Sequence, residues 1–153
     1  PSFGAERTGA PVAAFLRAAE QRITNHSQIY EPTHVIVLDP LLVTAVDVAA
    51  GLRPEGWILV NAPSPRSGAF SIPGAARVAT CDATAIAIRH ELGTRTTPIV
   101  NTAMAGAFAA LTDLVALDSL LAVIPELVPA HASANQEAAR EAYAAIARTA
   151  VLA

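Results

Sequence analysis

Two runs in the first half of the chain are apolar along almost their whole length, and they limit the folds open to it. Residues 35–38 (VIVL) are closed by Asp39 and Pro40, and residues 57–61 (WILVN) follow a Pro-Glu-Gly turn. A strand with one face in water alternates apolar and polar residues, whereas a strand buried on both faces is apolar throughout. The two runs therefore predict central strands of a sheet that is covered on both sides.

Helix signals alternate with these strands. Pro40 suits the first turn of a helix that ends at Gly51. Residues 77–80 predict a third strand, followed by Asp82 as the N-cap of a helix that ends at Gly93. Leu42, Val43 and Val46 are expected on the inward face of the first helix, and the second helix carries Ile86, Ile88 and Leu92. Strands that alternate with helices form parallel sheets, so the predicted fold class is α/β.

The two ends of the chain complete the expected architecture. Residues 11–17 alternate weakly and predict a strand, with residues 21–23 as its continuation or hairpin partner. The C-terminal third is helical, with helices over residues 103–111, 117–127 and 136–151. The proline-bearing stretch 125–129 separates the last two of these helices. On the last one, Glu137, Arg140 and Glu141 lie on one side, and Ala138, Ala142, Ala145 and Ile146 line another.

The composition excludes several classes of function. At 153 residues, of which 53% are hydrophobic, the chain can bury the core of one domain. The net charge is −3, and all ten basic residues are arginine. The chain therefore lacks the surplus of positive charge that is typical of nucleic-acid-binding proteins. The sequence has no apolar run of membrane-spanning length, and its single cysteine fits a reducing compartment. We expect a cytoplasmic protein with no nucleic-acid and no membrane partner.

The residue types that usually carry catalysis or metal binding do not converge in the sequence. Four scattered histidines and one cysteine lack the spacing of metal ligands; they are His26, His34, His90, His131 and Cys81. A GxSxG nucleophile motif, an intact GxGxxG and a P-loop are absent from the sequence. Asp39 and Asp82 follow strands, where α/β sheets place ligand-facing residues, but we interpret both as helix caps.

Residues 100–110 (VNTAMAGAFAA) predict a helix whose surface consists largely of small side chains. Asn101 or Thr102 at its start can cap the free amides. The small residues that follow are Ala103, Ala105, Gly106 and Ala107. Only small side chains let another backbone, another subunit or an extended ligand approach so closely. The segment therefore predicts a close-contact surface beside a polar helix start.

The sequence opens inside what reads as a loop. It begins at Pro1 rather than Met, so we expect the natural N-terminus to lie upstream. Glu6 and Arg7 are adjacent charges between Gly4 and Gly9, a composition that leaves the backbone free to meet a ligand. On composition alone, an exposed loop with a solvated ion pair is favoured.

Four segments in one order resemble a known family. They are GAERTGAPVAAFLR, SQIYEPTHVIVLDPLL, ATCDATAIAI and PIVNTAMAGAFAALTDLVALDSL, which begin at residues 4, 27, 79 and 98. The chain resembles the gamma subunit, or gamma domain, of the 2-oxoacid:ferredoxin oxidoreductases, the pyruvate and branched-chain oxoacid group. The resemblance spans nearly the whole chain and implies one gamma-type domain over residues 1–153 with a Rossmann-like three-layer fold.

The resemblance also implies partners and cofactors. Enzymes of this family oxidatively decarboxylate a 2-oxoacid on thiamine diphosphate with Mg, and they pass electrons through iron–sulfur clusters to ferredoxin. They usually transfer the acyl group to coenzyme A. The gamma piece carries neither thiamine nor cluster and packs against alpha, beta and delta-type subunits. A single cysteine agrees with this, because a cluster needs about four thiolates.

The family's motifs match two segments that are expected to contact coenzyme A. Its ERRGAP loop matches residues 6–11, and its NTAMLGAF helix start matches residues 101–108. Glu6 and Arg7 from the loop, and Asn101 and Thr102 from the helix start, are the implied binding residues. A guanidinium forks onto phosphate oxygens, and a helix N-terminus binds anions. A simple helix cap stays the alternative for the helix pair, and no catalytic residue is expected.

Two departures from the family pattern keep alternatives open. The family opens with a glycine-rich strand and helix of the GxGGQG kind, which is missing from this sequence. Thr8 stands where a second arginine is common, and Ala105 where leucine is. Members that use no coenzyme A, such as oxalate or aryl glyoxylate enzymes, stay open, as does an NAD-linked form with a flavin subunit. A free-standing α/β protein that binds a nucleotide-like ligand is the alternative from another class.

Overall fold

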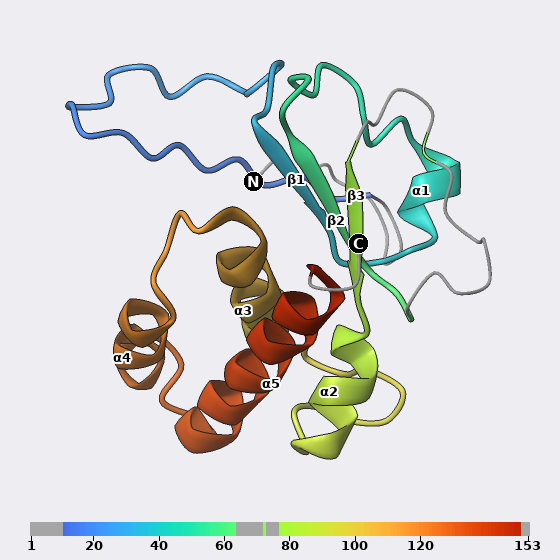
Figure 1. The fold of residues 1–153 in the computed structure, drawn as a ribbon, viewed down its shortest axis with the longest axis vertical. Coiled ribbons are helices and arrows are strands. Elements are labelled where there is room, and N and C mark those ends of the chain that lie inside the picture. Colours follow the sequence, from blue (N-terminus) through green and yellow to red (C-terminus); the bar gives the residue numbers. More distant parts are fainter. Residues whose placement is uncertain (1–10, 64–71, 73–76, 151–153) are drawn as a thin grey trace.

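A parallel sheet of three strands organises the chain. The computed structural model describes residues 11–63, 72 and 77–150, the last four of these by their backbone alone. Strands β1 (His34–Val37), β2 (Trp57–Asn61) and β3 (Val78–Cys81) lie in the order β1-β2-β3, all parallel (Figure 1). His34 pairs with Trp57 and Ile58 with Val78. The three predicted strands are confirmed to within one residue at their ends.

The side chains of the central strand β2 are buried on both faces of the sheet. Ile58, Leu59 and Val60 are fully buried, and successive side chains point to opposite faces. Ile58 and Val60 pack with Val37 and with residues of the β1–β2 connection, whereas Leu59 packs with the helices of the other face. The predicted α/β class is confirmed.

The connection after β1 is less helical than expected. Helix α1 (Leu42–Ala45) is a single turn, and the predicted helix up to Gly51 is wrong. Val46 is in extended conformation and exposed rather than inward-facing, while Leu42 and Val43 do pack against the sheet. Gly51 has φ +69° and lies directly against the carbonyl of Tyr30, where a Cβ would clash, so it ends a turn and not a helix.

Helix α2 (Ala83–Arg89) begins as predicted and ends early. The Asp82 carboxylate accepts a hydrogen bond from the amide of Ala85 at 2.9 Å, which confirms the N-cap. The amide of Leu92 bonds back to the Ala87 carbonyl, so the helix closes four residues before Gly93. Ile86 is buried and Ile88 is exposed, because two residues along a helix turn a side chain through about 200°.

Three helices form the C-terminal layer: α3 (Asn101–Thr112), α4 (Leu117–Leu127) and α5 (Ala132–Ala150). Figure 1 shows α3 and α5 side by side below the sheet, with α4 outside them and α2 on the other side of α5. Of the apolar side predicted for α5, Ala138, Ala142 and Ile146 are buried in one cluster with Leu59 and Met104, whereas Ala145 is half-buried.

The close-contact surface on α3 is occupied from within the chain. A Cβ on Gly106 would lie 2.2 Å from the carbonyl oxygen of Ala139, so the backbone of α5 rests directly on α3. Ala103 and Ala107 are fully buried in the same contact. Helix α5 is thus the backbone that approaches Gly106, Ala103 and Ala107, while Ala105 is half-buried and lies outside this cluster.

Helix α4 has the predicted bounds and includes Pro125, so the connection to α5 begins after Leu127 and not at Pro125. Proline has no N–H, so the carbonyl of Leu121, four residues earlier, loses its helical partner. The side-chain amide of Gln136 on α5 donates to that carbonyl at 2.8 Å and replaces the missing bond. Helix α5 itself starts at Ala132, four residues earlier than expected.

The predicted strand over residues 11–17 is wrong. Residues 11–33 contain no helix and no strand, and the apolar residues among them pack in none of the buried clusters. An isolated two-stranded hairpin is marginal in water without a core to cover it, which explains why the weak alternation is not enough. Among the described residues, no helix is long and apolar enough to cross a membrane.

Candidate ligand-binding site

Half of the predicted site can be described. Glu6 and Arg7 lie outside the described residues. Asn101 and Thr102 are the first two residues of α3. The geometry of the site is therefore built from the start of α3 and from what surrounds it.

Asn101 is exposed at the helix start. Its side-chain oxygen accepts a hydrogen bond from the amide of Thr102 at 3.0 Å. The N-cap position itself is held by Val100, which makes no side-chain cap bond. The cap prediction is thus wrong in position, although Asn101 does satisfy one of the free amides of the first turn. Its amide nitrogen makes no hydrogen bond within the described chain and faces solvent.

Thr102 is buried, with 7% of its surface exposed. Its hydroxyl donates to the side-chain oxygen of Asn135 at 2.7 Å. The amide of Asn135 in turn donates to the carbonyls of Ala130 at 3.3 Å and His131 at 3.1 Å, just before α5 begins. Thr102 therefore ties the start of α3 to the start of α5, and its hydroxyl is engaged inside the fold.

This tie brings two helix N-termini to one end of the molecule. Thr102 lies beside Asn135 and Gly106 beside Ala139, so α3 and α5 run in the same direction. Neither helix has an acidic residue in its first turn. Helix N-termini carry about half a positive charge each and attract anions. The exposed Asn101 stands at this end and offers amide donors to a negatively charged or amide-bearing group.

Asn61 at the carboxyl end of β2 is a residue that the sequence reasoning missed. It is buried, and its amide donates to the Leu38 carbonyl at 2.9 Å and to the Thr84 hydroxyl at 3.1 Å. Its oxygen accepts from the Thr84 amide at 3.2 Å. Asn61 thus joins the end of β1 to the first turn of α2. A single polar residue that closes an apolar strand was the signal for it.

The other candidates at this sheet edge are engaged locally. Asp82 caps α2, which confirms that interpretation. The interpretation of Asp39 as a helix cap is wrong, because Leu41 holds the N-cap position of α1 and Asp39 accepts from the Leu41 amide at 2.9 Å within the preceding turn. Burial, with Asp82 and Glu141 nearby, raises the pKa of the Cys81 thiol to about 11. A thiol with that pKa is a poor nucleophile at neutral pH.

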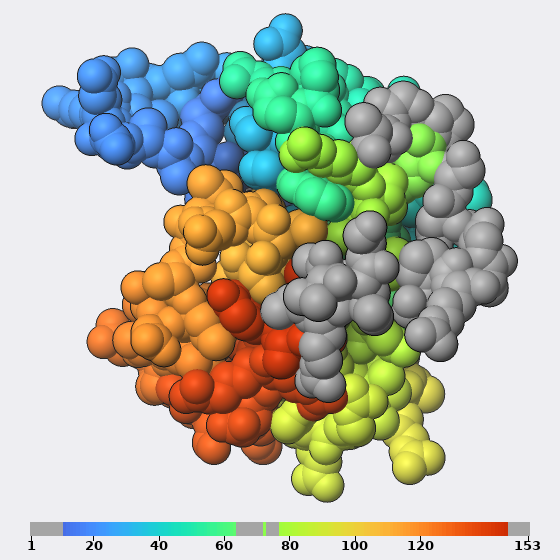
Figure 2. All heavy atoms as spheres, viewed as in Figure 1, coloured from blue at the N-terminus to red at the C-terminus, as the bar shows by residue number. Residues whose placement is uncertain are grey.

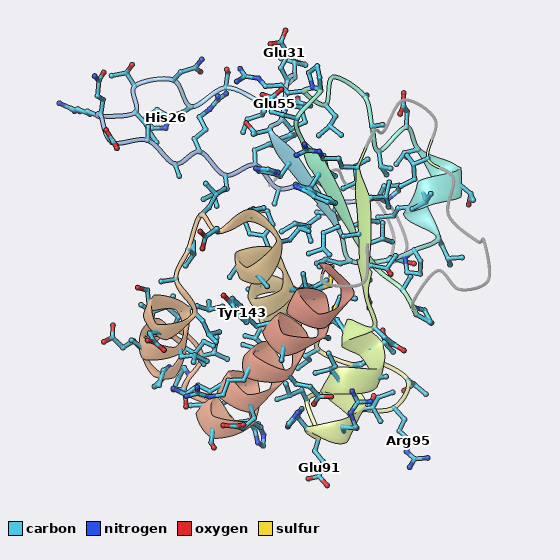
Figure 3. The ribbon with its side chains drawn as sticks, viewed as in Figure 1. His26, Glu31, Glu55, Glu91, Arg95 and Tyr143 are labelled. Atoms are coloured by element: carbon cyan, nitrogen blue, oxygen red, sulfur yellow. The ribbon has the colours of Figure 1, made fainter. Side chains whose placement is uncertain are left out.

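Two histidines make structural contacts. His34 accepts from the Trp57 amide at 3.3 Å and meets the ring of Phe108 edge-on, and partial burial lowers its pKa despite the nearby Glu55. His90 pairs with Glu141 at 2.7 Å. Figure 3 shows that Glu55 lies at the amino end of the sheet and His26 in the loop beyond it. Within the described residues, no three potential ligands gather as a metal site would require.

Comparison with known proteins identifies the family. The model of the family "Pyruvate ferredoxin/flavodoxin oxidoreductase" matches residues 1–145. The chain belongs to this family. The match covers nearly the whole sequence and confirms the resemblance found from its motifs.

Relatives from two archaea are similar over almost the entire chain. A protein from Methanothermobacter marburgensis named "Pyruvate synthase subunit PorC" is 46% identical over 144 residues, which are 94% of this chain and 76% of the relative. A protein from Pyrococcus furiosus named "Pyruvate/ketoisovalerate oxidoreductases common subunit gamma" is 43% identical over 146 residues, covering 94% of this chain and 77% of the relative. The chain thus spans about three quarters of these relatives.

A solved structure shares the fold. The pyruvate oxidoreductase subunit PORC from Thermotoga maritima superimposes with a TM-score of 0.63 at 28% sequence identity. The superposition covers 76% of this chain and 64% of the Thermotoga chain. The sheet and helices described above are therefore the fold of a subunit of this family.

Proposed function

We propose that the chain is the gamma-type subunit of a multi-subunit 2-oxoacid oxidoreductase. The complex oxidatively decarboxylates a 2-oxoacid to an acyl-CoA and passes the electrons to ferredoxin. The observation that carries this proposal is the similarity, over 94% of the chain, to proteins named as subunits of such enzymes. The chain contributes structure and a share of the coenzyme A site, and it works in the cytoplasm.

The redox and carbanion chemistry belongs to partner subunits in this proposal. Thiamine diphosphate, Mg and the iron–sulfur clusters are held by alpha, beta and delta-type subunits. A cluster is bound by about four thiolates, and the single cysteine of this chain is buried with a raised pKa. Thiamine diphosphate supplies the stabilisation of the carbanion that decarboxylation forms.

We assign coenzyme A contacts to the start of α3 and to the loop before residue 11. Asn101 is exposed beside two helix N-termini that lack acidic neighbours, which suits a phosphate or amide of the coenzyme. Glu6 and Arg7 complete the site from the loop, with Arg7 on a phosphate. Thr102 serves as a positioning residue, because its hydroxyl holds Asn135 and sets where the α3 start lies.

Thr8 favours a second candidate function, an oxidoreductase of the same family that does not use coenzyme A. Thr8 stands where a second arginine is common in this family, so the loop carries one positive charge fewer for a polyanionic ligand. A relative of the oxidoreductases that releases its product without coenzyme A is the second candidate. The electron acceptor of either form is ferredoxin or an NAD-linked flavin subunit.

The test is isolation of the natural complex. The chain is tagged in its native source and purified under anaerobic conditions, and thiamine diphosphate, iron and the accompanying subunits are measured. Oxidation of several 2-oxoacids is then assayed with and without coenzyme A. Recovery with thiamine- and iron-bearing subunits supports the proposal, and a lone colourless monomer contradicts it. Equal rates with and without coenzyme A select the second form.

A further inference from the structure

A pair of polar side chains lies within the apolar contact between α3 and α5. Thr102 and Asn135, here called the polar pair, have 7% and 3% of their surfaces exposed. The Thr102 hydroxyl donates to the Asn135 side-chain oxygen at 2.7 Å. Four residues further along each helix, Gly106 lies directly against the backbone of Ala139. The two helices therefore touch at two levels, one turn apart on both, and the first of these contacts is a directional hydrogen bond.

The polar pair is bonded to the starts of both helices. The side-chain nitrogen of Asn135 donates to the carbonyls of Ala130 and His131, in the turn before α5. His131 has φ +56°, in the left-handed region that residues other than glycine seldom adopt, so these bonds hold an unusual turn in place. On α3, the Thr102 amide donates to the side-chain oxygen of Asn101 at 3.0 Å. A continuous set of hydrogen bonds therefore leads from the turn before α5 to the exposed Asn101.

The apolar part of the contact does not by itself favour one register of α3 along α5. Its small residues are alike in size; they are Ala103 and Ala107 on α3 and Ala138 and Ala142 on α5. The hydrophobic effect is non-directional, so other pairings of such residues bury similar surface. A shift by one residue moves a helix about 1.5 Å and would break the bond of the polar pair, leaving buried polar groups unpaired. A single buried polar residue sets the register of coiled coils in the same way.

Helix α5 is also held by its other neighbours. Figure 2 shows its atoms between those of α4 and those of α2. The Gln136 side chain donates to the Leu121 carbonyl of α4. Glu141 pairs with Arg89 and His90 at the end of α2. Helix α5 is therefore a fixed support, and the polar pair determines where along this support α3 begins.

We propose that Asn135 is a positioning residue for coenzyme A, because its bond to Thr102 sets the register in which the start of α3 presents Asn101. This inference rests on the proposed function, which assigns a coenzyme A contact to Asn101. It deepens that function by naming a buried residue that does not touch the coenzyme and on which affinity for the coenzyme depends.

The test removes both members of the polar pair at once. Thr102→Val is combined with Asn135→Leu, and replacing both partners of a hydrogen bond by apolar groups of similar shape is nearly neutral for stability. The His131 carbonyl keeps its bond from the backbone amide of residue 135, and Ala130 is exposed, so water can reach its carbonyl. In the assembled complex, this double variant is expected to keep the melting temperature and kcat, and to raise KM for coenzyme A about threefold, as expected for loss of the Asn101 contact.

A third substitution tests whether the effect passes through Asn101. In an Asn101→Ala background, the double variant is expected to raise KM for coenzyme A no further, because the contact that it displaces is already gone. Independent effects would instead multiply to about ninefold and would overturn the inference.

Gln136→Leu is the matched control. Gln136 is the next residue along α5, and this change likewise replaces an amide side chain by leucine, but it breaks a bond to α4. It is expected to lower the melting temperature and to leave KM for coenzyme A unchanged. If Gln136→Leu raises KM as much as the double variant does, loosening of α5 is sufficient and the inference is overturned.

The outcomes separate the inference from the function on which it rests. If the wild-type chain brings no partner subunits, or if the complex works equally well without coenzyme A, the coenzyme A form of the proposed function fails and the inference falls with it. If the wild-type complex depends on coenzyme A and the double variant keeps the wild-type KM, the proposed function stands and the inference is overturned.

Nuclear magnetic resonance of the full chain tests the register directly. The Gly106 amide is expected to give one sharp resonance in the wild type, because a single register places it against Ala139. In the double variant this resonance is expected to broaden or divide, since an apolar pair permits more than one register. A Gly106 resonance that stays sharp and unshifted in the double variant overturns the inference.

Discussion

The α3–α5 contact and residues 11–31 differ in how their apolar residues are placed. On α3, the small residues Ala103, Gly106 and Ala107 let the backbone of α5 rest directly on the helix, and all three are buried. In residues 11–31, the large residues Val12 and Leu16 are exposed, and among the described residues they belong to no buried cluster. A stripe of small residues therefore serves the inside of this fold, while larger apolar residues lie on the surface of the described chain.

The strongest way to break the α3–α5 contact is to add a side chain at Gly106. Gly106→Val forces a branched group against the Ala139 carbonyl, and we expect it to lower the free energy of unfolding by about 3 kcal/mol. Ala105→Val on the half-buried neighbouring position is the control for helix propensity. Urea unfolding followed by circular dichroism measures both, and equal losses in the two variants would show that α5 does not press on Gly106.

A second change removes the polar tie at the start of the same contact. Thr102→Val leaves the side-chain oxygen of Asn135 buried without its donor, at an expected cost of about 2 kcal/mol of unfolding free energy. Thr102→Ser keeps the hydroxyl and is expected to restore most of it. A serine variant as unstable as the valine variant would mean that the methyl group matters and the hydrogen bond does not.

The exposed start of α3 is expected to respond in binding rather than stability. In the assembled complex, Arg7→Ala is expected to raise KM for coenzyme A about tenfold, which corresponds to roughly 1.4 kcal/mol. Asn101→Ala is expected to raise it about threefold by the same relation, with the melting temperature of the chain unchanged. Steady-state kinetics with coenzyme A as the varied substrate checks both. Unchanged coenzyme A kinetics in both variants would show that neither residue contributes to coenzyme A binding.

The hydrogen bond from the Gln136 side chain to the Leu121 carbonyl connects α5 to α4, and its contribution can be tested. Gln136→Leu leaves the Leu121 carbonyl without a donor, and we expect a loss of about 1 kcal/mol in unfolding free energy. In a Pro125→Ala background the alanine N–H can supply that bond within the helix, so Gln136→Leu is expected to have almost no effect there. The same loss of unfolding free energy in both backgrounds would show that Gln136 does not replace the helical hydrogen bond that Pro125 removes.

The smallest expected effect concerns α2 on the other side of α5. Partial burial would raise the pKa of Glu141, but hydrogen bonds from Arg89 and His90 outweigh it, and the pKa is lowered from its ordinary value of 4.5. The stabilisation is therefore present above pH 4.5 and is lost as the pH falls through the lowered value.

Glu141→Gln tests this dependence. The carboxylate is partly in water, so we expect its contribution to stay below about 1 kcal/mol. Unfolding free energies at several pH values between neutral and acid compare the variant with the wild type. The two should converge in acid, and a constant gap down to the lowest pH would show that the ion pairs with Arg89 and His90 do not cause the difference.

The parts of the fold that could be predicted are those determined by residues close together in the sequence. The strands around Val37 and Leu59 were predicted because runs of apolar, largely β-branched residues suit a buried parallel sheet wherever the chain places them. The Asp82 cap was predicted because the bond spans three residues. Helix α1 failed because the same apolar residues, Leu42 and Val43, pack equally well from a single turn.

In the candidate site, too, local features could be predicted from the sequence and distant contacts could not. Asn101 could be named from the sequence because a polar residue at a helix start is a local signal. The partner of Thr102 could not be named, since Asn135 is 33 residues away along the chain. Asn61 was missed for the same reason: its partners Leu38 and Thr84 belong to two other segments.

The sequence by itself determined that this chain is an α/β protein of the pyruvate ferredoxin/flavodoxin oxidoreductase family, because apolar runs, caps and family motifs are written in consecutive residues. Only the tertiary structure decided what the small residues of α3 contact and which apolar residues stay in water. Gly106 meets Ala139, and Leu16 meets no buried cluster. Both outcomes depend on how distant segments pack, and composition alone does not distinguish a buried contact from an exposed surface.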